Sequence, residues 1–178
     1  MIDPLISLIV SMSLALLFFM AARHKMSAPR QFQAQLDAYQ LLPKGMLPLS
    51  ARLLPLVEIA VAVLILIPFT RPYAAMLAAT LLTLYALAMA ANMMRGRADI
   101  DCGCGGEPQV LSAWLLLRNG VLVIASCLLL LPGSSRTLAW ADLFFLILLT
   151  AVLALVYLLV EQLVRNQSAL FNRSSSNG

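Results

Sequence analysis

Long apolar stretches alternate with short polar segments along the chain, and this pattern predicts membrane-spanning helices. A helix that crosses a bilayer needs about 20 mostly apolar residues. Five windows meet this requirement, at residues 5–22, 47–68, 72–94, 110–131 and 138–160. The sequence therefore predicts an all-α, polytopic membrane helical bundle that forms a single integral membrane domain over residues 1–165. Residues 166–178 are polar, and we expect them to form a disordered tail.

The start of the first window and the segment after it carry further helical signals. Asp3 precedes Pro4, an order typical of an N-cap followed by the first helical turn. Between the first two windows, Phe32, Leu36 and Tyr39 recur at the spacing of one helix face. This pattern predicts a short amphipathic helix, which either lies at the membrane surface or simply connects the two spans.

Composition agrees with a membrane protein and excludes other classes. Of the 178 residues, 62% are hydrophobic and 11% are charged, whereas soluble domains average about 45–50% and about 25%. The net charge of +4 comes with no long basic run. We therefore expect this chain to lie in the lipid bilayer and to bind no nucleic acid.

The densest chemical signal lies between the third and fourth windows. Cys102 and Cys104 are separated by Gly103, and Gly105 and Gly106 follow. Two thiols this close can form a disulfide if the backbone bends sharply, which glycine permits. Such a ring is strained, and strained, exposed disulfides exchange readily. The pattern predicts a redox pair.

Two other interpretations of these cysteines stay open. A structural metal site needs more ligands than two cysteines offer, so we expect no metal here. Alternatively, both thiols are reduced and have no role, although a polar, glycine-rich segment is an unusual place for such cysteines. We expect Cys127, within the fourth window, to be buried and inert.

Ionisable residues inside predicted spans are functional candidates by default. Glu58 lies deep in the second window and Arg118 deep in the fourth. Since a buried carboxylate needs a partner or a proton, the simplest hypothesis is an intramembrane Glu58–Arg118 pair. The alternative makes Glu58 part of a proton or quinone site.

With these features in place, the chain resembles the MauE family of methylamine utilisation proteins, within the wider DoxX-like group of redox-associated membrane proteins. The resemblance rests on six short stretches, namely Arg23-His24-Lys25, Pro29 with Phe32, Tyr39-Gln40-Leu41-Leu42-Pro43, Pro55 with Glu58, Asp99-Ile100-Asp101-Cys102-Gly103-Cys104-Gly105-Gly106, and Leu117-Arg118-Asn119. The Cys-Gly-Cys stretch is the most specific of them. The resemblance implies a DoxX-like four-helix core plus a fifth transmembrane helix.

The resemblance also implies a function. A protein of this family would be an accessory factor in the maturation of methylamine dehydrogenase, a quinoprotein whose small subunit is disulfide-rich. Its implied partners are that subunit and a thioredoxin-like protein of the MauD type. The chain would then be a membrane thiol–disulfide oxidoreductase that uses Cys102 and Cys104. Two alternatives stay open, a non-catalytic assembly scaffold and a DoxX-like quinone-reactive subunit with quinone as its cofactor.

The orientation in the bacterial inner membrane presents a conflict. Eight basic residues fall on one side of the predicted spans, namely Arg23, Lys25, Arg30, Lys44, Arg95, Arg97, Arg165 and Arg173. Arg71 and Arg136 fall on the other side, and the positive-inside rule therefore puts the cysteines in the cytoplasm. A periplasmic redox partner requires the opposite orientation, which is the one we favour.

Overall fold

The computed structural model describes residues 3–97, 111–132 and 140–176, and these residues form helices without any strand. In chain order the elements are α1 (Pro4–Ser27), α2 (Pro29–Tyr39), the 3₁₀ helix η1 (Lys44–Met46), α3 (Leu47–Leu64), α4 (Arg71–Met94), α5 (Ala113–Leu128) and α6 (Trp140–Ser176). The predicted all-α class is confirmed. Two compact units contain these elements, Met1–Arg136 with α1 to α5 and Thr137–Gly178 with α6.

Local sequence explains where the helices begin and end. A proline occupies the first turn of four helices, at Pro4, Pro29, Pro48 and Pro72, where its missing N–H costs nothing. As predicted, Asp3 caps α1, because its side chain accepts a hydrogen bond from the Leu5 N–H at 2.9 Å. After α2, Gln40 turns into the left-handed region at φ 51°.

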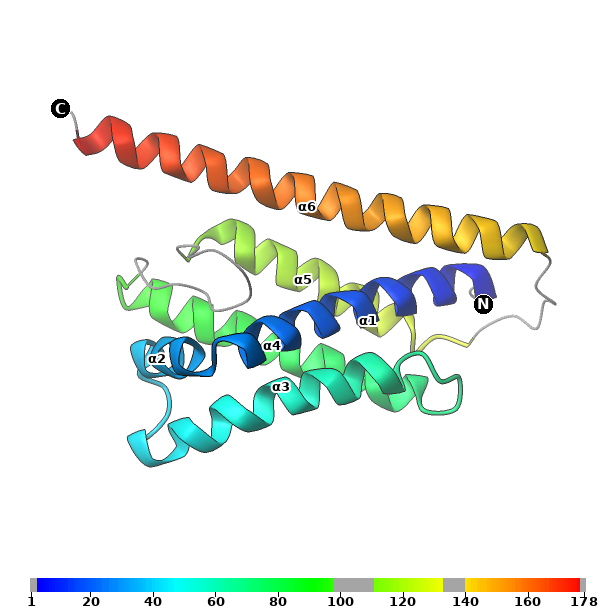
Figure 1. The fold of residues 1–178 in the computed structure, drawn as a ribbon, viewed down its shortest axis with the longest axis horizontal. Helices are drawn as coiled ribbons and strands as arrows, with labels where there is room; N and C mark the ends of the chain where they lie inside the picture. The colour runs from blue at the N-terminus through cyan, green and yellow to red at the C-terminus, as the bar shows by residue number, and fades with distance from the viewer. Residues whose placement is uncertain (1–2, 98–110, 133–139, 177–178) are drawn as a thin grey trace. The chain divides into compact units, whose positions relative to one another are not determined.

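The first unit is a bundle in which α1 packs mainly against α3, and α4 against α5 (Figure 1). Its buried apolar side chains form three clusters along the bundle. The middle cluster contains Phe18, Val61, Ala62, Ala78, Leu81 and Leu82. Ala78 is fully buried, and small residues of this kind let membrane helices approach closely.

The two ends of this bundle differ. At one end, Arg71 Nη1 donates to Ser7 Oγ at 3.2 Å and Nε donates to the Ile65 carbonyl at 3.3 Å, which joins α1, α3 and α4. At the other end, α2 contacts α3 next to the end of α1 (Figure 1). There, Tyr39 lies in a buried cluster with Met89, Leu111 and Leu115.

The predicted windows match the helices closely, with differences at their ends. Among the described residues, four helical segments are long and apolar enough to cross a membrane, at Pro4–Ser27, Lys44–Leu64, Arg71–Met94 and Trp140–Val160. Helix α5 is apolar but has only 16 residues, so it measures about 24 Å against a hydrocarbon core of about 30 Å. A count of five spans stays a prediction. Helix α6 continues to Ser176, through most of the tail that we expected to be disordered.

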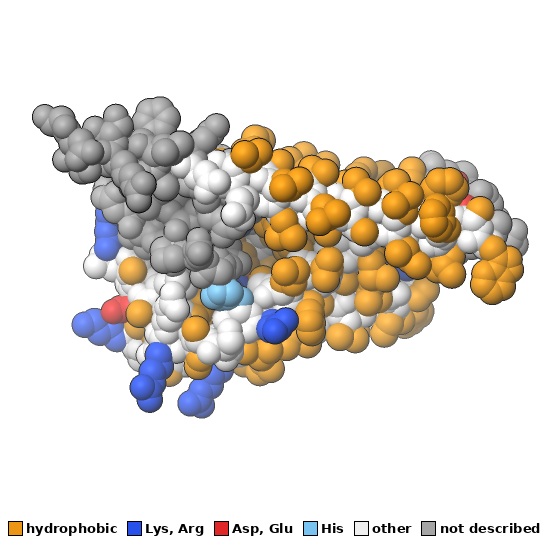
Figure 2. Space-filling view, turned by 45° about the horizontal axis from the view of Figure 1, so that its top comes forward, with side chains coloured by type: hydrophobic (Ala, Val, Ile, Leu, Met, Phe, Trp, Pro, Cys, Tyr) orange, Lys and Arg blue, Asp and Glu red, His pale blue; other side chains and the backbone are white. Residues whose placement is uncertain are grey.

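The surface of the described residues agrees with a lipid environment. Figure 2 shows a face that is largely covered by hydrophobic side chains, with Lys and Arg gathered at one end. Leu49, Leu53 and Leu56 on α3 are all about half exposed, which is expected where lipid replaces water around a helix. The chain is a multi-pass membrane protein.

Candidate functional site

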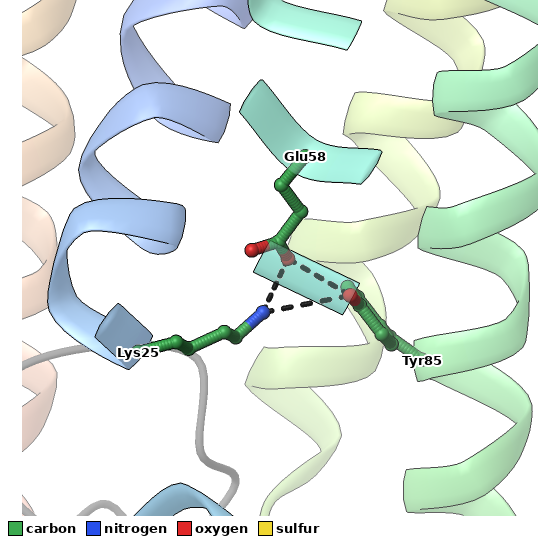
Figure 3. Close-up of polar contacts among 3 residues, drawn as sticks. All are labelled: Lys25, Glu58 and Tyr85. Atoms are coloured by element: carbon green, nitrogen blue, oxygen red, sulfur yellow. Dashed lines mark hydrogen bonds and ion pairs between the residues drawn. The ribbon is translucent and has the colours of Figure 1, made fainter. Parts of the chain in front are cut away.

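Three polar side chains from three helices meet inside the first unit. Lys25 of α1 forms an ion pair with Glu58 of α3, and both side chains are almost fully buried (Figure 3). Tyr85 of α4 donates its hydroxyl proton to Glu58 Oε1 at 2.8 Å. Lys25 Nζ also lies 3.5 Å from the same hydroxyl oxygen, which accepts from it. We call Lys25, Glu58 and Tyr85 the buried triad.

Helical periodicity brings the triad together. In α1 the buried residues Leu14, Phe18 and Ala22 lie at intervals of four, and Lys25 follows after three more residues on the same face. In α3, Glu58 lies on the buried face that includes Pro55 and Val61. Each helix therefore places one charged residue in a contact surface that is otherwise uncharged.

Aromatic rings complete the surroundings of the Lys25 ammonium. Nζ lies 5.2 Å from the centroid of the Phe32 ring on α2 and 4.7 Å from that of the Tyr85 ring. Both distances are within the range in which a cation is attracted to a ring face. The ammonium therefore contacts one carboxylate, one hydroxyl and two rings, which compensates for the loss of water around its charge.

The two oxygens of the Glu58 carboxylate differ in their hydrogen bonds. Oε1 accepts hydrogen bonds from both Lys25 and Tyr85. Oε2 is buried and has no hydrogen-bond partner among the described residues. Its lone pairs can accept a proton or a hydrogen-bond donor without disturbing the contacts at Oε1. The triad is therefore a buried ion pair with a tyrosine hydroxyl bound to it, in which the carboxylate oxygen Oε2 is still available as an acceptor.

The sequence identified Glu58 but not the residues around it. Its partner in the structure is Lys25, which we had counted as a loop residue on the basic side. Arg118 is half-buried on α5 and takes part in interactions of its own, and its pairing with Glu58 stays a prediction. The signal for Lys25 was available, because it continues the helical spacing of the buried face of α1.

The predicted redox pair, Cys102 and Cys104, lies outside the described residues. The chain on either side of it is described. Before it, the Arg97 N–H donates to the Asn92 carbonyl at 3.0 Å, just beyond α4. After it, Leu111 is buried in the cluster with Tyr39 of α2. We call residues 98–110 the cysteine segment, and its two flanks belong to the end of the bundle where α2 lies.

The expected burial of Cys127 was wrong, because its side chain is exposed, whereas its inertness stays a prediction. The buried residues of α5 are Leu115, Asn119 and Ser126. Cys127 directly follows Ser126, and one residue along a helix turns the side chain by about 100° away from that face. It also lies near the end of α5, about 20 Å along the helix from Ala113, so it is remote from the described flank at Leu111.

The fold and the triad define a class: a multi-pass helical membrane protein whose first helices enclose a buried ion pair. The particular family follows from comparison with known proteins. Residues 3–132 match the family described as methylamine utilisation protein MauE. This match spans α1 to α5, the buried triad and the cysteine segment, and the chain belongs to this family.

Individual relatives agree with this assignment. Methylamine utilization protein MauE of Paracoccus denitrificans is 42% identical over 125 residues, which cover 68% of this chain and 67% of the relative. The protein of the same name from Paracoccus versutus is 37% identical over 159 residues, which cover 87% of this chain and 85% of the relative. That of Methylophilus methylotrophus is 37% identical over 110 residues, 62% of this chain and 58% of the relative. No solved structure matches the chain.

Proposed function

We propose that this MauE family member exchanges thiols and disulfides through Cys102 and Cys104 during the maturation of a methylamine dehydrogenase. The observation that carries the proposal is the Cys-Gly-Cys sequence, bordered by further glycines, in a chain of a methylamine utilisation family. A disulfide between cysteines this close is strained, and strained disulfides are the labile ones.

The exchange transfers two electrons and two protons between two thiol pairs. A thiolate of the reduced pair attacks one sulfur of the oxidised pair, whose S–S bond breaks as a mixed disulfide forms. The second thiol of the reduced pair then loses its proton and attacks the mixed disulfide. The released thiolates take up the two protons, so one pair ends as a disulfide and the other as two thiols.

The proposed partners are a thioredoxin-like protein of the MauD type and, through it, the small subunit of the dehydrogenase. We place the chain in the bacterial inner membrane with the cysteine segment on the periplasmic side, where disulfides persist. The burial of Lys25 lessens the conflict with the positive-inside rule. Because Lys25 pairs with Glu58 inside the bundle, it is no longer a loop residue, and seven basic residues rather than eight stand against Arg71 and Arg136.

Trapping of a mixed disulfide tests the function. With Cys104→Ser or Cys102→Ser, the remaining thiol can form the mixed disulfide but the second thiol that would resolve it is missing, and we expect one variant to accumulate a covalent adduct with a thioredoxin-like protein. Cys127→Ser in the otherwise unchanged chain is the matched control and should give no adduct. Absence of an adduct from both variants, together with normal growth on methylamine, would favour the scaffold alternative.

A further inference from the structure

Helix α2 is a short element that depends on its contacts with the rest of the bundle. It has only 11 residues and its N-terminus has no side-chain cap, and isolated helices of this length are marginal in water. Its two buried residues are Phe32 and Tyr39. They are seven positions apart, so they lie on one face, two helical turns from each other.

The first of these residues meets the buried triad. The Phe32 ring faces the Lys25 ammonium at 5.2 Å, and the ammonium is held from two sides by Glu58 and Tyr85. One cation therefore connects α1, on which it resides, with α2, α3 and α4. This contact joins the triad to α2.

The second residue lies in the same buried cluster as Leu111, the first described residue after the cysteine segment. Tyr39 is buried together with Met89 of α4, Leu115 of α5 and Leu111. Leu111 is 4% exposed and directly follows the cysteine segment. The buried face of α2 thus has the triad at one end and the chain leaving the cysteine segment at the other.

From these contacts we infer that Lys25 is a positioning residue, which fixes α2 through Phe32 and, through Tyr39, fixes the flank of the cysteine segment at Leu111. The triad holds α2 at Phe32, and α2 carries this fixed position along its length to Tyr39. The relevance of this arrangement to thiol–disulfide exchange rests on the proposed function, since the flank at Leu111 determines where the cysteine segment leaves the bundle and thus its access to a partner. The positioning itself requires no redox activity.

A cross-link between the two residues at the far end of this connection tests the inference. Tyr39→Cys and Leu111→Cys are introduced into the full chain with Cys102, Cys104 and Cys127 replaced by serine, and the rate of disulfide formation is measured in membranes with an added oxidant. Loss of the cation in Lys25→Met should slow cross-linking about tenfold, as a desolvated cation–ring contact of about 1.4 kcal/mol requires. Arg23→Met, on an exposed residue of the same helix, should leave the rate unchanged.

Three further variants keep the test decisive if Lys25→Met fails to accumulate. Phe32→Leu removes the ring but leaves the ion pair, and it should slow cross-linking, whereas Phe32→Tyr keeps the ring and should preserve the rate. The double variant Lys25→Met/Glu58→Met removes both charges and should also slow cross-linking.

Unchanged cross-linking rates in Phe32→Leu or in the double variant overturn the inference. Slowed cross-linking with normal methylamine growth in the corresponding variant that keeps the native cysteines supports the positioning and contradicts its relevance to thiol–disulfide exchange, whereas the exchange itself is tested by the trapping of a mixed disulfide.

Discussion

Lys25 and Glu58 form a buried ion pair between α1 and α3, with side chains that are 4% and 1% exposed. Neither charge has water as an alternative partner, so each depends on the other and on Tyr85. Removal of one member leaves the other charge buried and uncompensated, which costs more than removal of both. This asymmetry gives the first prediction.

Lys25→Met should lower the free energy of unfolding by about 3–5 kcal/mol, because it strands the Glu58 carboxylate. Lys25→Met/Glu58→Met should cost clearly less than the sum of the two single variants. Thermal unfolding in detergent, together with accumulation in membranes, measures both. Additive losses would mean that the two residues do not act as a pair.

Tyr85→Phe should have a smaller effect, because the ring over Lys25 remains and only the hydroxyl is lost, which donates to Glu58 Oε1 and accepts from Lys25. We expect a loss of about 1–2 kcal/mol in the free energy of unfolding. Tyr73→Phe is the matched control, since Tyr73 lies on the same helix and is 66% exposed. Equal shifts of the unfolding midpoint for both variants would contradict the role of the Tyr85 hydroxyl.

Ala78→Leu tests the close packing of the middle cluster. Ala78 is fully buried beside Phe18 and Val61, and extra methylene groups at such a site typically cost about 1–3 kcal/mol. Thr80→Leu, at an exposed position of the same helix, introduces the same side chain and should be tolerated. A normal unfolding temperature for Ala78→Leu would show that α4 is not packed as tightly as described.

The helices were largely predictable because a bilayer requires long apolar segments, and these are visible in any sequence. The Asp3–Pro4 start of α1 was equally readable, since a cap needs only local residues. The partner of Glu58 was harder to predict. The pairing depends on how α1 and α3 align, which the sequence does not reveal. Lys25 also lies at the end of a span, where a lysine side chain is expected to extend to the lipid headgroups.

Two other features depended on tertiary contacts. The amphipathic pattern of α2 was recognised, but only the structure reveals that Phe32 faces a cation and that Tyr39 shares a buried cluster with Leu111. The exposure of Cys127 was missed because an apolar span does not reveal which of its faces is buried. The buried face of α5 becomes known only from its packing against α4, which buries Leu115, Asn119 and Ser126.

The central claim is that Cys102 and Cys104 cycle between a dithiol and a disulfide, and thiol labelling of intact cells tests it most directly. Cells grown on methylamine are treated with a maleimide before and after reduction, in the native chain and in Cys127→Ser. We predict two thiols that become reactive only after reduction and that disappear in Cys102→Ser/Cys104→Ser, with a membrane-impermeant maleimide reaching them from the periplasm. Full labelling of both cysteines without reductant in every growth state, with mature active dehydrogenase in the double serine variant, would contradict the account.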